Sequence, residues 1–182
     1  PAPNLFMPDK VFKLRSFIMV GKMRDQNCHG QVQYDEYARK SLVFDPVENI
    51  LLPFVRFFAE SFAMPQTQSW VRSINYATQH FGADEGAVIA QRLLLVLLVM
   101  QKNKPSGFNF SAPSCKICSE VVTQDERRFM AAIKSVRKGN SSQTIIELML
   151  LCEGQDTSRL TDCIKKLCAV LPSGTSIRTT KH

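Results

Sequence analysis

The feature that most constrains the fold is the longest apolar stretch, from Ala87 to Met100, which only Gln91 and Arg92 interrupt. Its uninterrupted part, 93–100, is far shorter than the ~20 apolar residues that a membrane-spanning helix needs. A helix that is apolar on nearly all sides needs neighbours on all sides. The stretch therefore predicts a helix in the core of a helical domain or at an oligomer interface, and no transmembrane segment.

Helix start and stop patterns divide the rest of the chain. Asp45, followed by proline and by Glu48, is typical of a helix N-terminus. The apolar residues of this helix continue to position 62, and Pro53 predicts that it kinks or begins anew there. Thr123 and Glu126 form the S/T-x-x-E capping box of another helix. Periodicity and glycine or proline stops predict four further helices, over 67–80, 84–103, 142–152 and 156–171.

No segment alternates convincingly between apolar and polar residues, so the sequence predicts an all-α fold. We expect an irregular bundle of about six helices with a poorly structured N-terminal arm. A Pro/Ser/Gly-rich connector marks a boundary between two candidate subdomains, and its two aromatic residues, Phe108 and Phe110, are expected to attach it to the rest of the domain. The expected parts are the arm 1–44, the helical domain 45–172 with subdomains 45–103 and 119–172 joined by the connector 104–118, and a disordered tail 173–182.

The connector carries a Cys-x-x-Cys pair, Cys115 and Cys118. Such a pair can supply two of the four ligands of a structural zinc site. A second pair is missing, so further ligands would come from scattered positions: Cys28, His29, His80 or Cys152. The alternatives are a redox-active dithiol, which the absence of a strand–helix–strand pattern disfavours, or two thiols that pack in the loop against Phe108 or Phe110.

Cysteine usage and the N-terminal sequence favour a reduced, cytoplasmic protein. Three of the six cysteines, Cys152, Cys163 and Cys168, fall on apolar helical stripes, where a thiol packs as a small hydrophobe. The N-terminal apolar segment, 11–20, is interrupted by two cationic residues and does not resemble a secretory signal.

The net charge of +7 lies outside the middle of the chain, with +3 over 1–44, zero over 45–110 and +4 over 111–182. A basic surface can attract nucleic acid. The segment 143–152, which would take the place of a recognition helix, lacks Lys and Arg and is expected to be core. An ordinary solvated face is therefore favoured over nucleic-acid binding by the candidates Arg127, Arg128, Lys134, Arg137, Lys138, Lys165 and Lys166.

The sequence contains no phosphate-binding loop, serine-nucleophile elbow or zinc-protease motif, which favours a non-enzymatic protein. The leading hypothesis is a helical interaction or regulatory domain that forms a homo-oligomer or binds a protein partner. The alternatives are a zinc-stapled nucleic-acid-binding regulator and a small cysteine-dependent redox protein. The expected interface lies on two apolar helix faces, with the residues Phe54, Phe57, Phe58, Leu94, Leu97 and Leu98.

Overall fold

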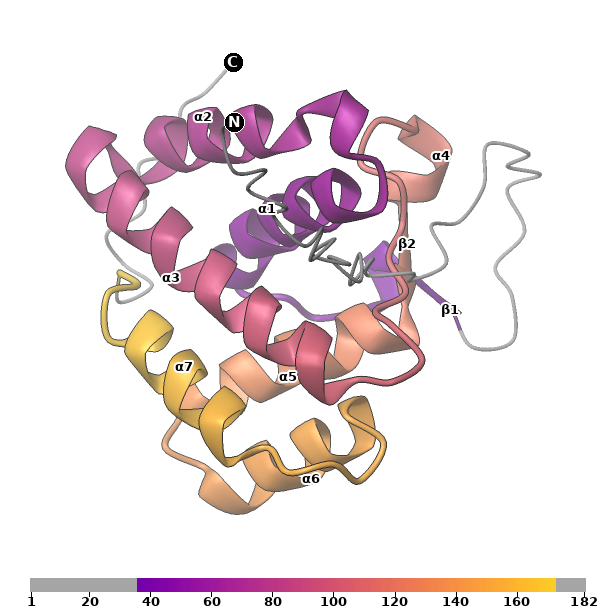
Figure 1. Ribbon diagram of the computed structural model, residues 1–182, viewed down its shortest axis with the longest axis vertical. Helices are drawn as coiled ribbons and strands as arrows, with labels where there is room; N and C mark the ends of the chain where they lie inside the picture. The colour runs from indigo at the N-terminus through magenta and orange to yellow at the C-terminus, as the bar shows by residue number, and fades with distance from the viewer. Residues whose placement is uncertain (1–35, 173–182) are drawn as a thin grey trace, which may run out of the picture.

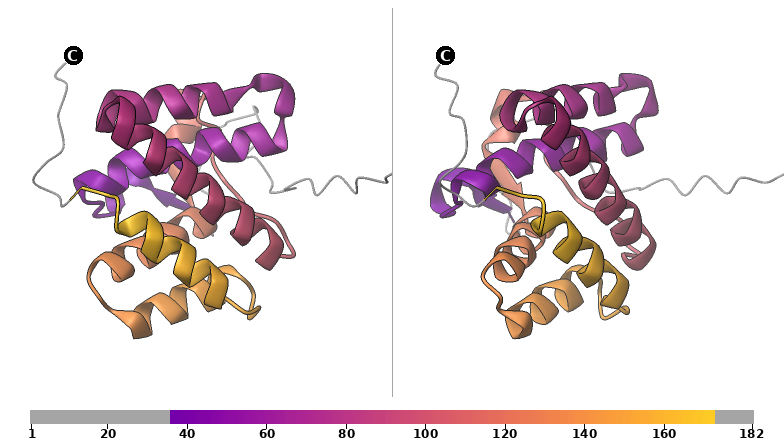
Figure 2. Two further views of the ribbon diagram at one scale, coloured as in Figure 1. Left: turned by 60° about the vertical axis from the view of Figure 1, so that its left-hand side comes forward. Right: turned by 90° about the vertical axis from the view of Figure 1, so that its left-hand side faces the viewer.

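The structure is a computed structural model that describes residues 36–172. The expected tail and most of the expected arm lie outside the described residues. The described part is mostly helical and confirms the fold class, with all six expected helices in place (Figures 1 and 2). Its helices are α1 (Pro46–Ala63), α2 (Ser69–Phe81), α3 (Ala83–Asn103), α4 (Lys116–Ser119), α5 (Gln124–Arg137), α6 (Ser141–Leu151) and α7 (Ser158–Cys168).

A small antiparallel sheet was not expected from the sequence. Strand β1 (Glu36–Ala38) pairs with β2 (Val121–Thr123), so that Tyr37 lies opposite Val122. Strands of this length are too short to show an alternating pattern. Strand β1 is followed by the 3-10 turn η1 (Arg39–Ser41), and a second turn, η2 (Pro65–Thr67), connects α1 to α2.

Both predicted N-terminal caps are formed. The Asp45 carboxylate accepts the backbone N–H of Glu48 at 2.9 Å, and the Glu48 carboxylate accepts the N–H of Asp45 at 2.8 Å. Thr123 and Glu126 exchange the equivalent bonds at 3.2 and 2.9 Å. Each pair satisfies amide groups that the first turn of a helix would otherwise leave unpaired.

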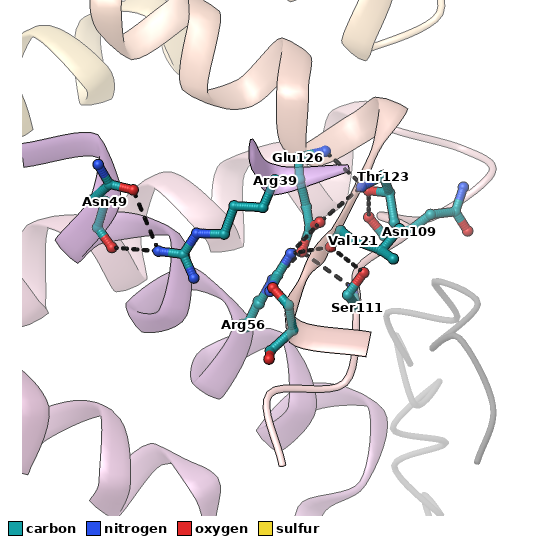
Figure 3. Close-up of polar contacts among 9 residues, drawn as sticks. Arg39, Asn49, Arg56, Asn109, Ser111, Val121, Thr123 and Glu126 are labelled. Atoms are coloured by element: carbon teal, nitrogen blue, oxygen red, sulfur yellow. Dashed lines mark hydrogen bonds and ion pairs between the residues drawn. The ribbon is translucent and has the colours of Figure 1, made fainter. Parts of the chain in front are cut away.

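Helix α1 does not begin anew at Pro53, but continues through it to Ala63. A proline has no N–H, so the carbonyl four residues earlier loses its helical partner. That carbonyl belongs to Asn49, and it accepts a hydrogen bond from the Arg39 guanidinium at 3.3 Å (Figure 3). The contact offers the carbonyl an alternative donor at the point where α1 would otherwise be weakest.

Helix α2 packs closely on α1 because small residues recur every four positions on one of its faces. Ser69, Ser73 and Ala77 are all buried, and their size lets the two backbones approach. The Ser73 hydroxyl donates to the carbonyl of Phe54 at 3.2 Å, and the Ser69 hydroxyl donates to the Glu60 carboxylate. These two bonds fix the position of α2 along α1.

Helices α2 and α3 meet most closely beside the turn that connects them. A Cβ placed on Gly86 would lie 2.7 Å from the carbonyl oxygen of Ala77, which is closer than real Cβ atoms come. Only glycine therefore allows this approach without a shift of backbone. From the turn the two helices diverge, with α1 behind them (Figure 1).

One hydrophobic core includes residues from α1, α3, α5, α6 and α7. Its centre is the inner face of α3, where Leu93, Val96, Leu97 and Met100 are fully buried. The connector after α3 is attached to this core by Phe108 and Phe110, each 1% exposed. The predicted attachment of the connector by its two aromatic rings is therefore confirmed.

Candidate functional site

A buried ion pair joins α1 to the start of α5. The side chains of Arg56 and Glu126 are 1% and 0% exposed, and Arg56 Nε lies 2.7 Å from Glu126 Oε1. A second bond joins Arg56 Nη2 to Glu126 Oε2 at 2.9 Å, so the contact is bidentate (Figure 3). Buried charges require such pairing because desolvation alone would disfavour them strongly.

Backbone groups complete the environment of the ion pair. Arg56 also donates to the carbonyls of Ser119 at 2.9 Å and Val121 at 2.6 Å. Glu126 accepts the backbone N–H of Ser111 at 3.1 Å, in addition to its capping bond from Thr123. The pair therefore joins α1, the connector, β2 and α5, and its contacts are those of a structural centre rather than of a catalytic site.

A second polar cluster surrounds Lys104, which is 6% exposed. Its ammonium group lies 3.3 Å from Asp125 Oδ1 and 2.9 Å from Glu153 Oε1. Asp125 also accepts the backbone N–H of Asn109 at 2.8 Å. Hydrogen bonds from Ser106 and Lys104 lower the pKa of Glu153. The cluster holds the connector against α5 and against the residues that follow α6.

The cysteine pair lies around α4. The sulfur of Cys115 accepts the backbone N–H of Cys118 at 3.4 Å and so caps the short helix. Cys118 is buried and disulfide-bonded. The thiols of Cys115, Cys152, Cys163 and Cys168 are not disulfide-bonded. Metal binding requires a thiolate, so Cys118 could serve as a zinc ligand only after reduction of this disulfide.

The histidine proposed as a zinc partner lies away from the cysteine pair. The guanidinium of Arg72 donates to the hydroxyl of Ser114, next to Cys115, at 2.8 Å. His80 is eight residues further along α2, about 12 Å at 1.5 Å per residue. Its ring contacts the ring of Tyr76, with a centroid distance of 4.3 Å, and burial lowers the pKa of His80.

The remaining zinc partners are not brought to α4 either. Cys28 and His29 lie outside the described residues. Cys152 directly follows α6, which lies at the opposite end of the molecule from α4 (Figure 1). Within residues 36–172 no group of three or more His, Cys, Asp or Glu side chains is arranged to hold a metal ion.

Most of the basic candidates for nucleic-acid binding are engaged within the chain. Arg137 pairs with Asp45 at 2.6 Å, and Lys134 lies 3.5 Å from Glu48. The Arg128 guanidinium donates to the carbonyl of Leu150 at 2.7 Å. Arg127 is engaged as well, over the ring of Tyr37, whereas Lys138, Lys165 and Lys166 are exposed.

The residues predicted to form an interface are placed mostly inside the chain. Phe54, Phe58 and Leu97 are at most 4% exposed and belong to the core. Phe57 is half-buried under the guanidinium of Arg72, and Leu94 is half-buried. Leu98, at 38% exposed, is accessible on the outer side of α3.

Helix α6 has an exposed apolar face that the sequence placed in the core. Its inner face, with Thr144, Glu147, Leu148 and Leu151, is buried. On the other side four large apolar side chains are each 49–50% exposed; together they are called the α6 surface: Ile145, Ile146, Met149 and Leu150. The expectation of a core helix is thus correct for one face, because no described element covers the other.

A second apolar feature is a pocket of about 510 Å³ between α1, α2 and α3, called the α2–α3 pocket. One of its walls is α2, which lies at the other end of the molecule from α6 (Figures 1 and 2). Three helices supply its lining, which consists of Phe58, Ser61, Phe62, Trp70, Ile74, Ala87, Ala90, Gln91 and Leu94.

No protein-family model, curated protein or solved structure matches this chain. None of the helices described in residues 36–172 is both long and apolar enough to span a membrane, as the sequence predicted.

Proposed function

We propose that the protein is a non-enzymatic helical interaction domain that forms a homo-oligomer through the α6 surface. The observation that supports this function is the exposure of four large apolar side chains on one face of one helix. Contiguous exposed apolar patches commonly mark interaction sites, because water contact with them is unfavourable. The inner face of α6 is already covered by the chain, so a partner on the outer face would complete the burial of its large apolar side chains.

The chemistry of the α6 surface favours a second copy of the chain as the partner. A two-fold interface places the same residues opposite each other. Because the chain carries a net charge of +7, most such self-contacts would oppose like charges. The α6 surface itself contains no charged side chain, and its helix begins with the uncharged residues 141–143. Two copies can therefore meet there without charge repulsion.

Hydrogen bonds at both ends of α6 hold the helix in place before any partner binds. The Asn140 side chain caps α6 by accepting the N–H of Gln143 at 3.0 Å. Near the other end, Arg128 donates to the carbonyl of Leu150. Both ends of α6 are thus held, and little ordering of the backbone would oppose association.

The native mass of the purified protein tests this proposal. We expect a mass of about twice 20.6 kDa from light scattering at micromolar concentration. Ile146→Glu should give a monomer, because it would place two carboxylates opposite each other in an apolar interface. Val88→Glu is the matched control, since Val88 is 44% exposed on α3. A monomeric wild-type protein at high micromolar concentration would contradict the proposal.

A further inference from the structure

The α2–α3 pocket supports an inference that is independent of self-association. We propose that it binds a neutral, largely aromatic small molecule that carries one hydrogen-bonding group. The pocket is lined in part by α2, which lies at the opposite end of the molecule from α6 (Figures 1 and 2), so the pocket and the α6 surface can be tested separately.

The packing of the three helices explains why a pocket exists at this position. The backbones of α2 and α3 touch at Ala77 and Gly86, and the helices diverge from there. The space between them is closed on the inner side by α1, which contributes the buried ring of Phe58. The serine contacts between α2 and α1 hold this wall in place. The pocket is therefore a consequence of rigid backbone contacts.

The size of the pocket suits a small molecule. Its volume of about 510 Å³ falls within the range of roughly 300–1,000 Å³ that is typical of small-molecule sites. A pocket with three helical walls can surround a compact ligand on several sides, and this is how such sites remove most of a ligand's surface from water.

The lining favours aromatic ligands. Three rings face the pocket, those of Phe58, Phe62 and Trp70, and aliphatic walls come from Ile74 and Leu94. Rings attract one another in offset or edge-to-face arrangements beyond the effect of area alone. Trp70 is 49% exposed, so a ligand that covered its indole would remove a large apolar surface from water.

The polar groups of the pocket indicate the charge and the hydrogen-bonding capacity of its ligand. No charged side chain lines it, so an ionic ligand would lose its hydration without gaining a counter-ion. Its two polar residues are Ser61 and Gln91. The Ser61 hydroxyl already donates to the carbonyl of Phe57 at 3.0 Å. The Gln91 amide makes no hydrogen bond with the described residues, and it can orient one polar group of a ligand.

A neutral fluorescent probe, N-phenyl-1-naphthylamine, tests the site directly. It has two aromatic systems and one N–H, and Trp70 is the only tryptophan of the chain. Energy transfer from Trp70 to the probe therefore reports that the probe has bound to the chain, and the substitutions described below show where. In the full chain we expect saturable transfer with a dissociation constant on the order of 10 µM. No saturable transfer up to the solubility limit of the probe would overturn the proposal.

Two substitutions on adjacent exposed positions of α3 locate the probe. Ala87 lines the pocket, and Ala87→Phe should weaken binding at least about tenfold by filling the space. Val88 is not among the lining residues, and Val88→Phe should leave binding unchanged. Equal affinities for the two variants would overturn the assignment. If Ala87→Phe failed to fold, Gln91→Phe at the same exposed wall would replace it with the same expectation.

The charge of the probe tests the proposed ligand class. The sulfonated analogue 1-anilinonaphthalene-8-sulfonate should bind at least about tenfold more weakly, because the pocket offers its anion no cation. Equal binding would overturn the neutral class. A second copy of the chain in the pocket would make probe binding weaken as protein concentration rises, and a segment of this chain in the pocket would abolish binding. Either result would also overturn the proposal.

Discussion

The start of α5 buries charged side chains, whereas the outer face of α6 exposes apolar ones. At the start of α5 a charged pair, Arg56 and Glu126, is almost completely buried. On α6, four large apolar side chains are half exposed. The buried charges have partners from four parts of the same chain, whereas the described residues offer no cover for the α6 surface. The first region explains how the fold is held together, and the second is where we expect the protein to contact another molecule.

The largest expected effect comes from removal of the buried cation. Arg56→Met should lower the free energy of unfolding by about 3–5 kcal/mol, because it leaves the Glu126 carboxylate buried without its partner. Chemical denaturation monitored by circular dichroism measures this change. The control is Arg72→Met, since Arg72 is 48% exposed and 3.8 Å from its acidic partner, and should change stability by less than about 1 kcal/mol.

The double variant Arg56→Met with Glu126→Gln separates charge from packing. It removes both charges and retains a side chain at position 126 that can complete the cap. It should be more stable than Arg56→Met alone, because no uncompensated charge remains. If the single substitution cost less than about 1 kcal/mol, the ion pair would not be the structural centre of this fold.

The two faces of α6 should respond differently to truncation. Leu148 is fully buried, and Leu148→Ala should lower the free energy of unfolding by about 2–5 kcal/mol through loss of packing and a residual cavity. Ile145 is 50% exposed, and Ile145→Ala should have a much smaller effect in a dilute, monomeric sample. Equal losses at the two positions would show that the outer face is packed within the monomer.

A smaller effect is expected at two thiols, those of Cys152 after α6 and of Cys168 at the end of α7. Burial raises the pKa of Cys152 and of Cys168 to about 11. Because the folded pKa exceeds the ordinary value of 9.0, the contribution of each thiol to stability is complete below about pH 9 and is lost as the pH rises toward 11. We therefore expect the thiols of Cys152 and Cys168 to react slowly with a disulfide reagent at pH 8 in the native protein and fast in denaturant. Fast reaction of these two thiols in the native protein at pH 8 would contradict the burial that raises their pKa values.

Local features of the fold could be predicted from the sequence. The caps at Asp45 and Thr123 depend on residues three positions apart, so their side-chain types identify them directly. The expected helices ended close to the observed positions because glycine and proline stop a helix locally. The attachment of the connector by Phe108 and Phe110 followed from two aromatic rings in a loop between apolar helices.

Features that depend on distant parts of the chain could not be predicted. Arg56 and Glu126 are 70 residues apart, and neither pattern nor spacing connects them. The capping role of Glu126 was evident, but its role as a buried counter-ion was not. The composition of α6 showed that it is mostly apolar, yet which face would remain exposed depends on how α5 and α7 pack. The disulfide state of Cys118 likewise has no local sequence pattern.

The proposed partner of the α6 surface is a second copy of this chain. The most direct test of this proposal is the midpoint of thermal unfolding as a function of protein concentration, because association stabilises a folded state by mass action. We expect the wild-type midpoint to rise by several degrees over a hundredfold increase in concentration, and the midpoint of Ile146→Glu to stay constant. A wild-type midpoint that does not depend on concentration would contradict the account.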